Sequence, residues 1–357
     1  RSGTMTTQDR SSRSSSQSTR TEDSSGVSSD TVTSAPIVVL GGGEAGTAVL
    51  EVLNDAGLAA DVTLIEPSPY HYDQPEWMRV GTAGMEKEET RSSKRTEVPS
   101  PVTWVKDWVM EVDPDAQTIA TEAGTKIRYD YLVVALGIET LWDRIRGLKP
   151  NLGTRGICSV YGYEQAERAW EMIRDFSGGR AIFTAPSTPH KGGTAPLHVL
   201  RRAESVWRET GVRAQTDLFF TTAAPTVDEE EGDEREEDIH VYTGYDLVEV
   251  RPEAQEAVFN VSKGKSQSCN VLPYDLLHVV PPMRPPALLE QSGLAYRDGT
   301  MKGYMEVHPD SFQHKRFGSV FGIGDAIGVE GIKTGERARE QALAVAEALE
   351  RIMEKEE

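Results

Sequence analysis

The residues with the clearest chemical meaning form a glycine-rich segment, Gly41 to Gly46, which reads GGGEAG and fits G-x-G-x-x-G. It follows the apolar run Ile37–Leu40 and precedes a helical pattern. In such a loop Gly41 permits a tight turn, Gly43 lets a diphosphate approach the backbone, and Gly46 lets the helix pack closely on the strand. The helix N-terminus then presents N–H groups and partial positive charge to the phosphates.

An acidic residue completes this pattern. Glu66 follows the apolar run Val62–Ile65 and stands 20 residues after Gly46. A carboxylate at this place accepts hydrogen bonds from ribose hydroxyls and disfavours a 2′-phosphate. A glycine-rich segment alone also occurs in ordinary turns. With strand, helix and acid all in place, the pattern favours a dinucleotide site.

Two later segments indicate which dinucleotide binds. An apolar run ends in Gly324 and Asp325, and an Asp at such a place in a flavoprotein accepts a hydrogen bond from the ribityl chain. An ordinary turn capped by Asp is the alternative. Ala135 and Gly137 follow another apolar run and let a cofactor approach the backbone. Together with the glycine loop, these segments favour FAD over NAD.

A parallel sheet is needed to bring these segments together. Strand-like apolar runs alternate with helical patterns over residues 36–135 and again over residues 181–221. This order predicts an α/β fold with two Rossmann-like, doubly wound domains of the FAD/NAD(P)-binding type, the first one discontinuous. We expect residues 35–155 and 281–357 to form an FAD-binding domain, and residues 156–280 to form the second domain.

The expected elements follow from hydrophobic periodicity. The strands are Ile37–Leu40, Val62–Glu66, Val102–Val112, Tyr131–Ala135, Ala181–Thr184, Asp217–Thr221, Leu276–Val280 and Val320–Ile323. The helices are Ala45–Ala56, Tyr163–Phe176, Pro196–Glu209 and a last one with Ala342, Val345, Ala346, Leu349 and Ile352 on one face. Ala257–Phe259 and Val271–Leu272 flank a polar turn, as in a surface hairpin.

The second domain lacks a glycine motif. After its first strand the chain reads APSTP over Ala185–Pro189, where two prolines stiffen the loop and remove N–H donors. We therefore expect that NAD(P)H does not bind there and that electrons come from another donor. The histidines show no metal-ligand spacing, so no metal site is expected.

Composition restricts the partners and the location. Residues 1–34 contain 19 Ser or Thr and no Leu, Ile, Phe, Tyr or Trp, which predicts a disordered tail, with a transit peptide as the alternative. The net charge of −19 argues against nucleic acid and against an anionic membrane surface. Nine acidic residues lie within 228–238 and read as a solvated segment. We expect a cytoplasmic protein, with peripheral attachment to the inner membrane face as the alternative.

Several segments together carry a family resemblance. His71 to Trp77 reads HYDQPEW, Leu277 to Met283 reads LHVVPPM, and the FGIGD segment is followed by Lys333 and Thr334. With these segments, from about Pro36 to the last helix, the chain resembles the sulfide:quinone oxidoreductases, in particular their mitochondrial-type branch. These are FAD-dependent members of the pyridine nucleotide-disulfide oxidoreductase superfamily.

The resemblance implies roles for individual residues. The glycines and Glu66 would hold the ADP half of FAD, and Val109 would contact the adenine through its backbone. Asp325 would bind the ribityl chain. Lys333 would lie near the flavin pyrimidine carbonyl and stabilise negative charge on the reduced flavin, whereas a solvated lysine at a helix start is the alternative.

The family's two redox cysteines are not found at the matching positions. In the family, sulfide attacks a disulfide beside the flavin, so thiolates are required. Gly192 stands where one cysteine would follow the segment Thr188–Lys191, and Ala326 stands where the other would follow Asp325. Cys158 lies near a position where some relatives carry a thiol, so either a residual catalytic role or plain burial is open. The chain's second cysteine, in a polar hairpin, reads as inert.

The resemblance and its departures lead to two alternative functions. The first is an FAD-dependent oxidoreductase with a divergent electron donor, using a small-molecule donor and acceptor among sulfur species and quinones. The second is a non-catalytic FAD-binding paralogue with a structural or regulatory role. Relatives continue into a C-terminal segment that helps form a quinone pocket and a membrane-binding surface. The sequence ends at Glu357, which argues against quinone reduction and membrane docking; the oligomeric state is left open.

Overall fold

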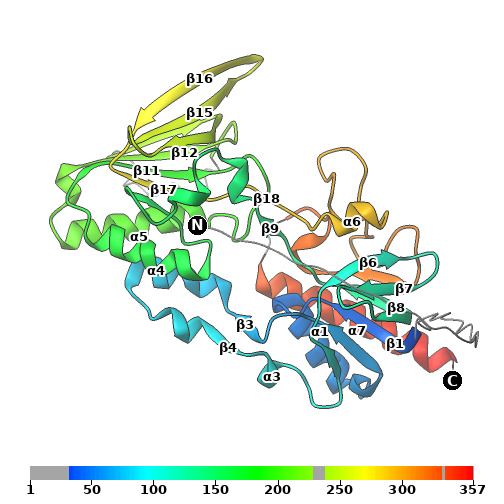
Figure 1. The fold of residues 1–357 in the computed structure, drawn as a ribbon. Coiled ribbons are helices and arrows are strands. Elements are labelled where there is room, and N and C mark those ends of the chain that lie inside the picture. Colours follow the sequence, from blue (N-terminus) through cyan, green and yellow to red (C-terminus); the bar gives the residue numbers. More distant parts are fainter. Residues whose placement is uncertain (1–31, 228–237, 332–333, 357) are drawn as a thin grey trace, which may run out of the picture. The chain divides into compact units, whose positions relative to one another are not determined.

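The computed structural model describes residues 32–227, 238–331 and 334–356 (Figure 1). Within these residues, strands alternate with helices along the chain and form two sheets in which most strands are parallel. This arrangement confirms the predicted α/β class with two Rossmann-like sheets. The expected tail up to residue 31, most of the acidic segment (228–237) and Lys333 lie outside the described residues.

The first sheet carries the cofactor signals. Its strand order is β5-β2-β1-β8-β7-β6, with β19 paired to β8. The central strands are parallel, and the last residues of β1 and β8, up to Leu40 and Val134, are buried, as expected for a sheet covered on both faces. The strands are β1 Val32–Leu40, β2 Val62–Ile65, β5 Thr103–Val105, β6 Val109–Asp113, β7 Thr118–Thr121, β8 Lys126–Val134 and β19 Val320–Gly322.

Two long helices cover this sheet. Helix α1 (Glu44–Asp55) and helix α7 (Gly335–Glu356) lie side by side in Figure 1 and share one apolar cluster with β1. Val49 of α1 and Val345 of α7 are completely buried in this cluster. The apolar face expected for the last helix is therefore confirmed, although α7 extends further in both directions.

The second sheet has the order β10-β17-β11-β12-β13, and all its pairings are parallel. Trp207 and Phe183 are fully buried between this sheet and the helices α4 and α5. The elements are β10 Ile157–Cys158, β11 Gly179–Ala185, β12 Thr216–Thr222, β13 Ile239–Thr243, β17 Leu276–His278, α4 Tyr163–Arg174 and α5 Ala195–Glu209.

Smaller elements complete the described chain. Three antiparallel strands form a separate sheet and include the expected hairpin. These and the remaining elements are β3 Tyr70–Tyr72, β4 Arg91–Ser93, β9 Glu139–Thr140, β14 Tyr245–Arg251, β15 Glu256–Lys263, β16 Ser266–Pro273, β18 Met283–Arg284, α2 Trp77–Ala83, α3 Lys94–Glu97 and α6 Leu288–Gln291. In the described ranges, no helix is long and apolar enough to cross a membrane.

Two expectations need correction. Strand β1 begins at Val32, inside the segment assigned to the disordered tail, because residues 32–35 pair with residues 126–129 of β8. The single strand expected over Val102–Val112 is two strands, β5 and β6. Asp107 separates them: its carboxylate accepts hydrogen bonds from the N–H groups of Trp108 (2.8 Å) and Ala123 (3.1 Å), which competes with strand pairing.

Candidate functional site

The carboxyl ends of the central strands meet at one edge of the first sheet. Three backbone hydrogen bonds join these ends: Gly41 N–H to Ile65 O (3.0 Å), Ala135 N–H to Leu40 O (2.8 Å) and Ile323 N–H to Val134 O (3.0 Å). Ligands of open α/β sheets bind at such an edge. The glycine loop, the segment after β8 and the Gly-Asp turn, which lie far apart in sequence, are thus brought together.

The glycine loop fits closely against its neighbours on one side and is open on the other. Gly41 has φ +93°, and a Cβ there would lie 2.5 Å from the Ala135 carbonyl oxygen. A Cβ on Gly46 would lie 1.9 Å from the Gly41 carbonyl oxygen, so only glycine lets α1 begin this close to the loop. A Cβ on Gly43 would meet no atom within 4 Å. This open backbone fits a bound diphosphate.

Glu44, the first residue of α1, is held by two other elements. Its carboxylate lies 3.3 Å from Arg339 of α7 and 3.9 Å from the His71 ring of β3. The guanidinium of Arg339 therefore offsets the negative charge that Glu44 would otherwise place beside a diphosphate.

Glu66 lies directly after β2, against the glycine loop. One carboxylate oxygen accepts a hydrogen bond from Gly42 N–H (2.6 Å) and the other from Ser68 N–H (2.7 Å). Each carboxylate oxygen has two lone pairs, so hydroxyl donors of a ribose can still bind. The structure therefore places Glu66 directly beside the glycine loop.

The Gly-Asp turn is fixed by a buried glutamine. Gly324 has φ +76° and donates its N–H to Gln341 Oε1 of α7 at 2.7 Å. Gln341 is 4% exposed. Burial raises the pKa of Tyr304 to about 12, and the negative charge of Asp325 contributes to this shift. Asp325 thus lies near the phenol of Tyr304, and Ala326 after it is buried.

A lysine from the loop after β11 approaches the same turn. Lys191 Nζ donates a hydrogen bond to Gln74 Oε1 at 2.6 Å. Burial lowers the pKa of Lys191, and the charge of Asp325 opposes that shift. The TPHK segment before Gly192, the HYDQPEW segment and the Gly-Asp turn therefore converge around one cation.

The remaining expected cofactor residues are placed as follows. Ala135 is buried beside Gly41, and Gly137 has φ +68° with open space where a Cβ would lie. Val109 begins β6 and packs on the apolar cluster that contains Ile65 at the end of β2. No contact can be given for Lys333, which lies outside the described residues.

Neither cysteine has the surroundings of a nucleophile. Cys158 in β10 is 1% exposed and pairs with His278 of β17. Burial raises the pKa of its thiol to about 12, so the thiolate is disfavoured. Cys269 is exposed on β16 opposite Asn260. The structure therefore gives no support to a catalytic role of Cys158.

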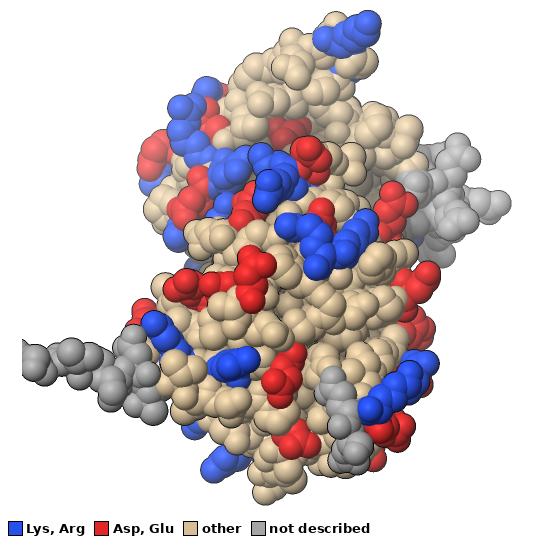
Figure 2. Space-filling view, turned by 90° about the vertical axis from the view of Figure 1, so that its right-hand side faces the viewer, with Lys and Arg blue, Asp and Glu red and all other residues tan. Residues whose placement is uncertain are grey.

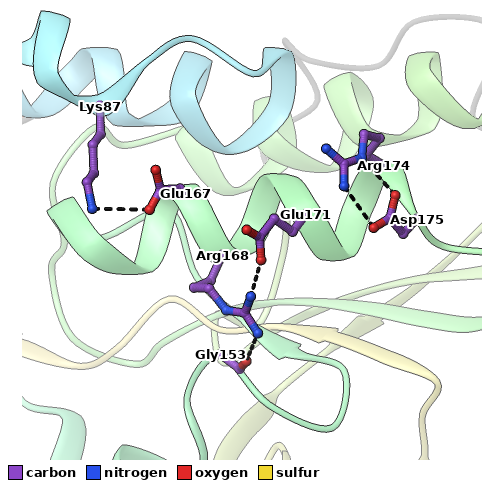
Figure 3. Close-up of polar contacts among 7 residues, drawn as sticks. All are labelled: Lys87, Gly153, Glu167, Arg168, Glu171, Arg174 and Asp175. Carbon is purple, nitrogen blue, oxygen red and sulfur yellow. Dashed lines mark hydrogen bonds and ion pairs between the residues drawn. The ribbon is translucent and has the colours of Figure 1, made fainter.

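Ion pairs fasten the segment after α2 to helix α4. Lys87 Nζ lies 2.5 Å from Glu164 and 3.1 Å from Glu167, and Figure 3 draws the second of these contacts. In the same view Arg168 reaches both Glu171 and the Gly153 carbonyl. The Lys87 contacts tie the chain that follows the HYDQPEW segment to the second sheet's helix layer, and Arg168 ties α4 to the loop at Gly153.

The acidic charge is not gathered in one patch on the face drawn in Figure 2. Lys and Arg side chains are interspersed there with Asp and Glu. Although the net charge is −19, this face carries cationic side chains that can contact an anionic partner.

Two residues at the site are not among those expected from the sequence. Gln341 interrupts the apolar stripe of α7 between Ala338 and Val345, and a polar residue at a core position is a signal for a buried hydrogen bond. Lys94 is 2% exposed beneath the glycine loop. Its neighbours in sequence, RSSKR, read as a solvated surface, so no pattern announces its burial.

Comparisons with known proteins agree with this geometry. Residues 35–172 match the family model described as "Pyridine nucleotide-disulphide oxidoreductase". The mitochondrial sulfide:quinone oxidoreductase of Mus musculus is 35% identical over 313 residues, which cover 86% of this chain and 68% of that protein. Its counterpart from Dictyostelium discoideum is 33% identical over 315 residues, with the same coverage of both proteins.

Solved structures agree on the fold. The sulfide:quinone oxidoreductase of Aquifex aeolicus superposes with a TM-score of 0.74 at 20% identity, over 90% of this chain and 77% of that one. At 20% identity this likeness shows only a shared fold, whereas the mitochondrial relatives, at 33–35% identity, show the family. The chain therefore belongs to the sulfide:quinone oxidoreductase family and is a flavin-dependent oxidoreductase.

Proposed function

We propose that this protein binds FAD and transfers electrons from a small-molecule donor to a small-molecule acceptor without a cysteine pair. The observation that carries the proposal is the convergence of the glycine loop, Glu66 and the Gly-Asp turn at one sheet edge. A flavin bound there accepts two electrons from a donor and passes them on to an acceptor. Residues 35–155 and 281–357 would form its domain, and residues 156–280 the second one.

Each expected residue then has a stated part in holding the cofactor. The N–H groups at Gly43 and at the start of α1 receive the diphosphate, since they lie at a helix N-terminus and the Cβ position of Gly43 has no atom within 4 Å. Glu66 accepts the ribose hydroxyls, and Val109 borders the adenine. Gly324 and Asp325 hold the ribityl chain. Ala135 and Gly137 provide backbone against which the cofactor lies, and Lys333 belongs near the pyrimidine carbonyl.

The donor side is proposed to differ from the relatives. Gly192 and Ala326 cannot form a persulfide, Cys158 is buried, and Cys269 lies on the β15–β16 hairpin. Lys191 remains on this side and is held by Gln74. A cation beside the flavin side of the site favours an anionic donor, so small sulfur anions are the class to test first.

The missing cysteine pair also favours a second candidate, a non-catalytic FAD-binding paralogue. An anaerobic reductant screen on the purified yellow protein separates the two. We expect sulfide to bleach the flavin no faster in wild type than in Cys158→Ser, and a thiol-independent donor to bleach both. The non-catalytic candidate is favoured if dithionite reduces the bound flavin but every donor tested reduces the bound flavin no faster than it reduces free FAD. Rapid sulfide bleaching that Cys158→Ser abolishes would contradict the thiol-independent route.

A further inference from the structure

A buried lysine lies under the glycine loop. Lys94, the first residue of α3, is 2% exposed, which is unusual for a lysine. Its ammonium donates a hydrogen bond to the Gly42 carbonyl oxygen and lies 3.3 Å from His71 Nδ1. A buried charge is costly unless it is well bonded. The loop carbonyl and the imidazole are therefore what keep this lysine inside.

The two peptide bonds that flank Gly42 are held by oppositely charged side chains. Gly42 N–H donates to Glu66 Oε2 at 2.6 Å, and Gly42 C=O accepts from Lys94. Thr47 Oγ1 also donates to this carbonyl, at 3.3 Å. Hydrogen bonds to charged groups are about twice as strong as neutral ones. The conformation of the loop at Gly42 is therefore set by Glu66 after β2 and by Lys94 of α3.

The direction of one N–H group follows from this arrangement. The peptide bond between Gly42 and Gly43 is planar and trans, so its N–H points away from its carbonyl. Because Lys94 holds the carbonyl on the inner side of the loop, the Gly43 N–H points to the opposite side. Gly43 is also the loop residue whose Cβ position has no atom within 4 Å.

We propose that Lys94 is a positioning residue for the dinucleotide diphosphate: it holds the Gly42 carbonyl so that the Gly43 N–H faces the phosphates. Its charge also offsets Glu66, which would otherwise repel the same phosphates. The inference rests on the proposed FAD binding. It adds to the glycine motif a residue 48 positions after Gly46 in the sequence.

The test uses the full chain stripped of flavin, with FAD, ADP and adenosine as ligands. We expect Lys94→Met to weaken FAD and ADP binding about tenfold or more, the loss of one charge-assisted hydrogen bond, and to leave adenosine binding within about twofold. Lys94→Gln keeps a neutral donor to the carbonyl and should fall between. Lys106→Met is the matched control, because Lys106 lies over the Trp104 ring near Glu66 and touches no glycine of the loop among the described contacts.

The role of Lys94 can also be tested in the unmutated protein, through the pH dependence of ligand binding. Burial lowers the pKa of Lys94, while the charges of Glu66 and Glu97 oppose this shift. The groups that face its ammonium are Glu66 after β2, Glu97 on its own helix and His71 on β3, which in turn faces Glu44. As pH rises through the lowered pKa of Lys94, ADP affinity should fall relative to adenosine affinity, because the ammonium loses its proton.

Several outcomes would overturn the inference. If a folded Lys94→Met variant binds ADP as tightly as wild type, the inference is wrong. If the variant binds ADP and adenosine equally more weakly, the inference is also wrong, because the mutation then disturbs the site in general. If neither variant folds, a pH-independent ratio of ADP to adenosine affinity in wild type overturns it, and a falling ratio supports it. A wild type that binds neither FAD nor ADP would contradict the proposed function itself.

Discussion

Gly324 of the Gly-Asp turn contacts Ala45 of the glycine-loop helix: a Cβ built on Gly324 would lie 2.8 Å from the Ala45 Cβ. The two residues are 279 positions apart in the sequence. Gly324 also has φ +76°, where a side chain is strained. The late turn can therefore reach the start of α1 only because residue 324 has no side chain.

This contact predicts that Gly324→Ala weakens both folding and FAD binding. The left-handed backbone costs roughly 1–2 kcal/mol for a non-glycine residue, and the clash with Ala45 adds to it. Gly293→Ala is the matched control, since Gly293 has φ +71° but open space around its Cβ position. Thermal unfolding should show a loss in both variants and a larger one in Gly324→Ala. FAD titration should show a loss in Gly324→Ala alone, and equal effects in the two variants would contradict the contact.

Gln341 should support the cofactor through Gly324. Gln341→Met removes the acceptor of the Gly324 N–H and leaves this half-buried donor without its partner, which costs about 1 kcal/mol. We expect lower stability and weaker FAD binding, measured by urea unfolding and by quenching of flavin fluorescence. Leu343→Ala is the control, because Leu343 is 49% exposed on the same helix. Unchanged FAD affinity in a less stable Gln341→Met would show that the bond serves folding only.

The local parts of the site could be predicted from the sequence. The glycine loop, Glu66 and the Gly-Asp turn each depend on a strand and on the few residues after it, and the structure has these elements nearly where the periodicity places them. Their meeting at one edge follows from parallel strands, whose carboxyl ends share one side of the sheet.

The parts that depend on long-range contacts could not be predicted. Lys94 reads as a surface lysine, and Lys191 is singled out only as the end of the segment Thr188–Lys191. Nothing near either lysine in sequence reveals that Gly42 and Gln74 are their partners. The division between β5 and β6 could not be predicted for a similar reason. The carboxylate of Asp107 accepts a hydrogen bond from Ala123 N–H, 16 residues away, and the pattern of apolar residues does not reveal that bond.

The two thiols should react very differently. Burial raises the pKa of Cys158 to about 12, whereas Cys269 is exposed. Iodoacetamide at about pH 8 should label one thiol in the folded chain and both in guanidinium chloride, counted by intact mass. Cys269→Ser should leave the folded chain unlabelled. Labelling of folded Cys269→Ser at the rate of a free thiol would mean that Cys158 is accessible, and its catalytic role would have to be reopened.

NADH should reduce the protein poorly. The loop after β11 is occupied by its own contacts: Ser187 donates a hydrogen bond to Asp246 (2.9 Å), and Thr188 Oγ1 accepts one from Met283 N–H (2.9 Å). With two prolines and a carboxylate beside it, this loop offers a diphosphate few donors and a repulsive charge. Anaerobic mixing with micromolar NADH should leave the flavin oxidised, while dithionite bleaches it. Fast stoichiometric bleaching by NADH would contradict this account.

His278 sets a pH dependence of stability. It is fully buried in β17, accepts a hydrogen bond from Val160 N–H (3.2 Å) and stacks on Phe183 with ring centroids 5.5 Å apart. Burial lowers its pKa to about 3. An unfolded histidine takes up a proton near pH 6.5, but the folded one does not do so until about pH 3. The contribution of this neutral ring to stability is therefore complete above about pH 6.5 and is lost as pH falls toward 3.

The expected size makes this measurable. Between about pH 7.5 and about pH 5, proton uptake by the unfolded chain at this one histidine lowers the free energy of unfolding by about 2 kcal/mol. His278→Gln keeps an acceptor for Val160 N–H but does not titrate, so urea unfolding of this variant should lose about 2 kcal/mol less than wild type over the same range. His308→Gln is the control, because His308 is exposed, and unfolding of this variant should follow wild type. If wild type and His278→Gln lose the same free energy of unfolding over this range, His278 is already protonated in the folded protein. The prediction that it is buried in its neutral form would then be wrong.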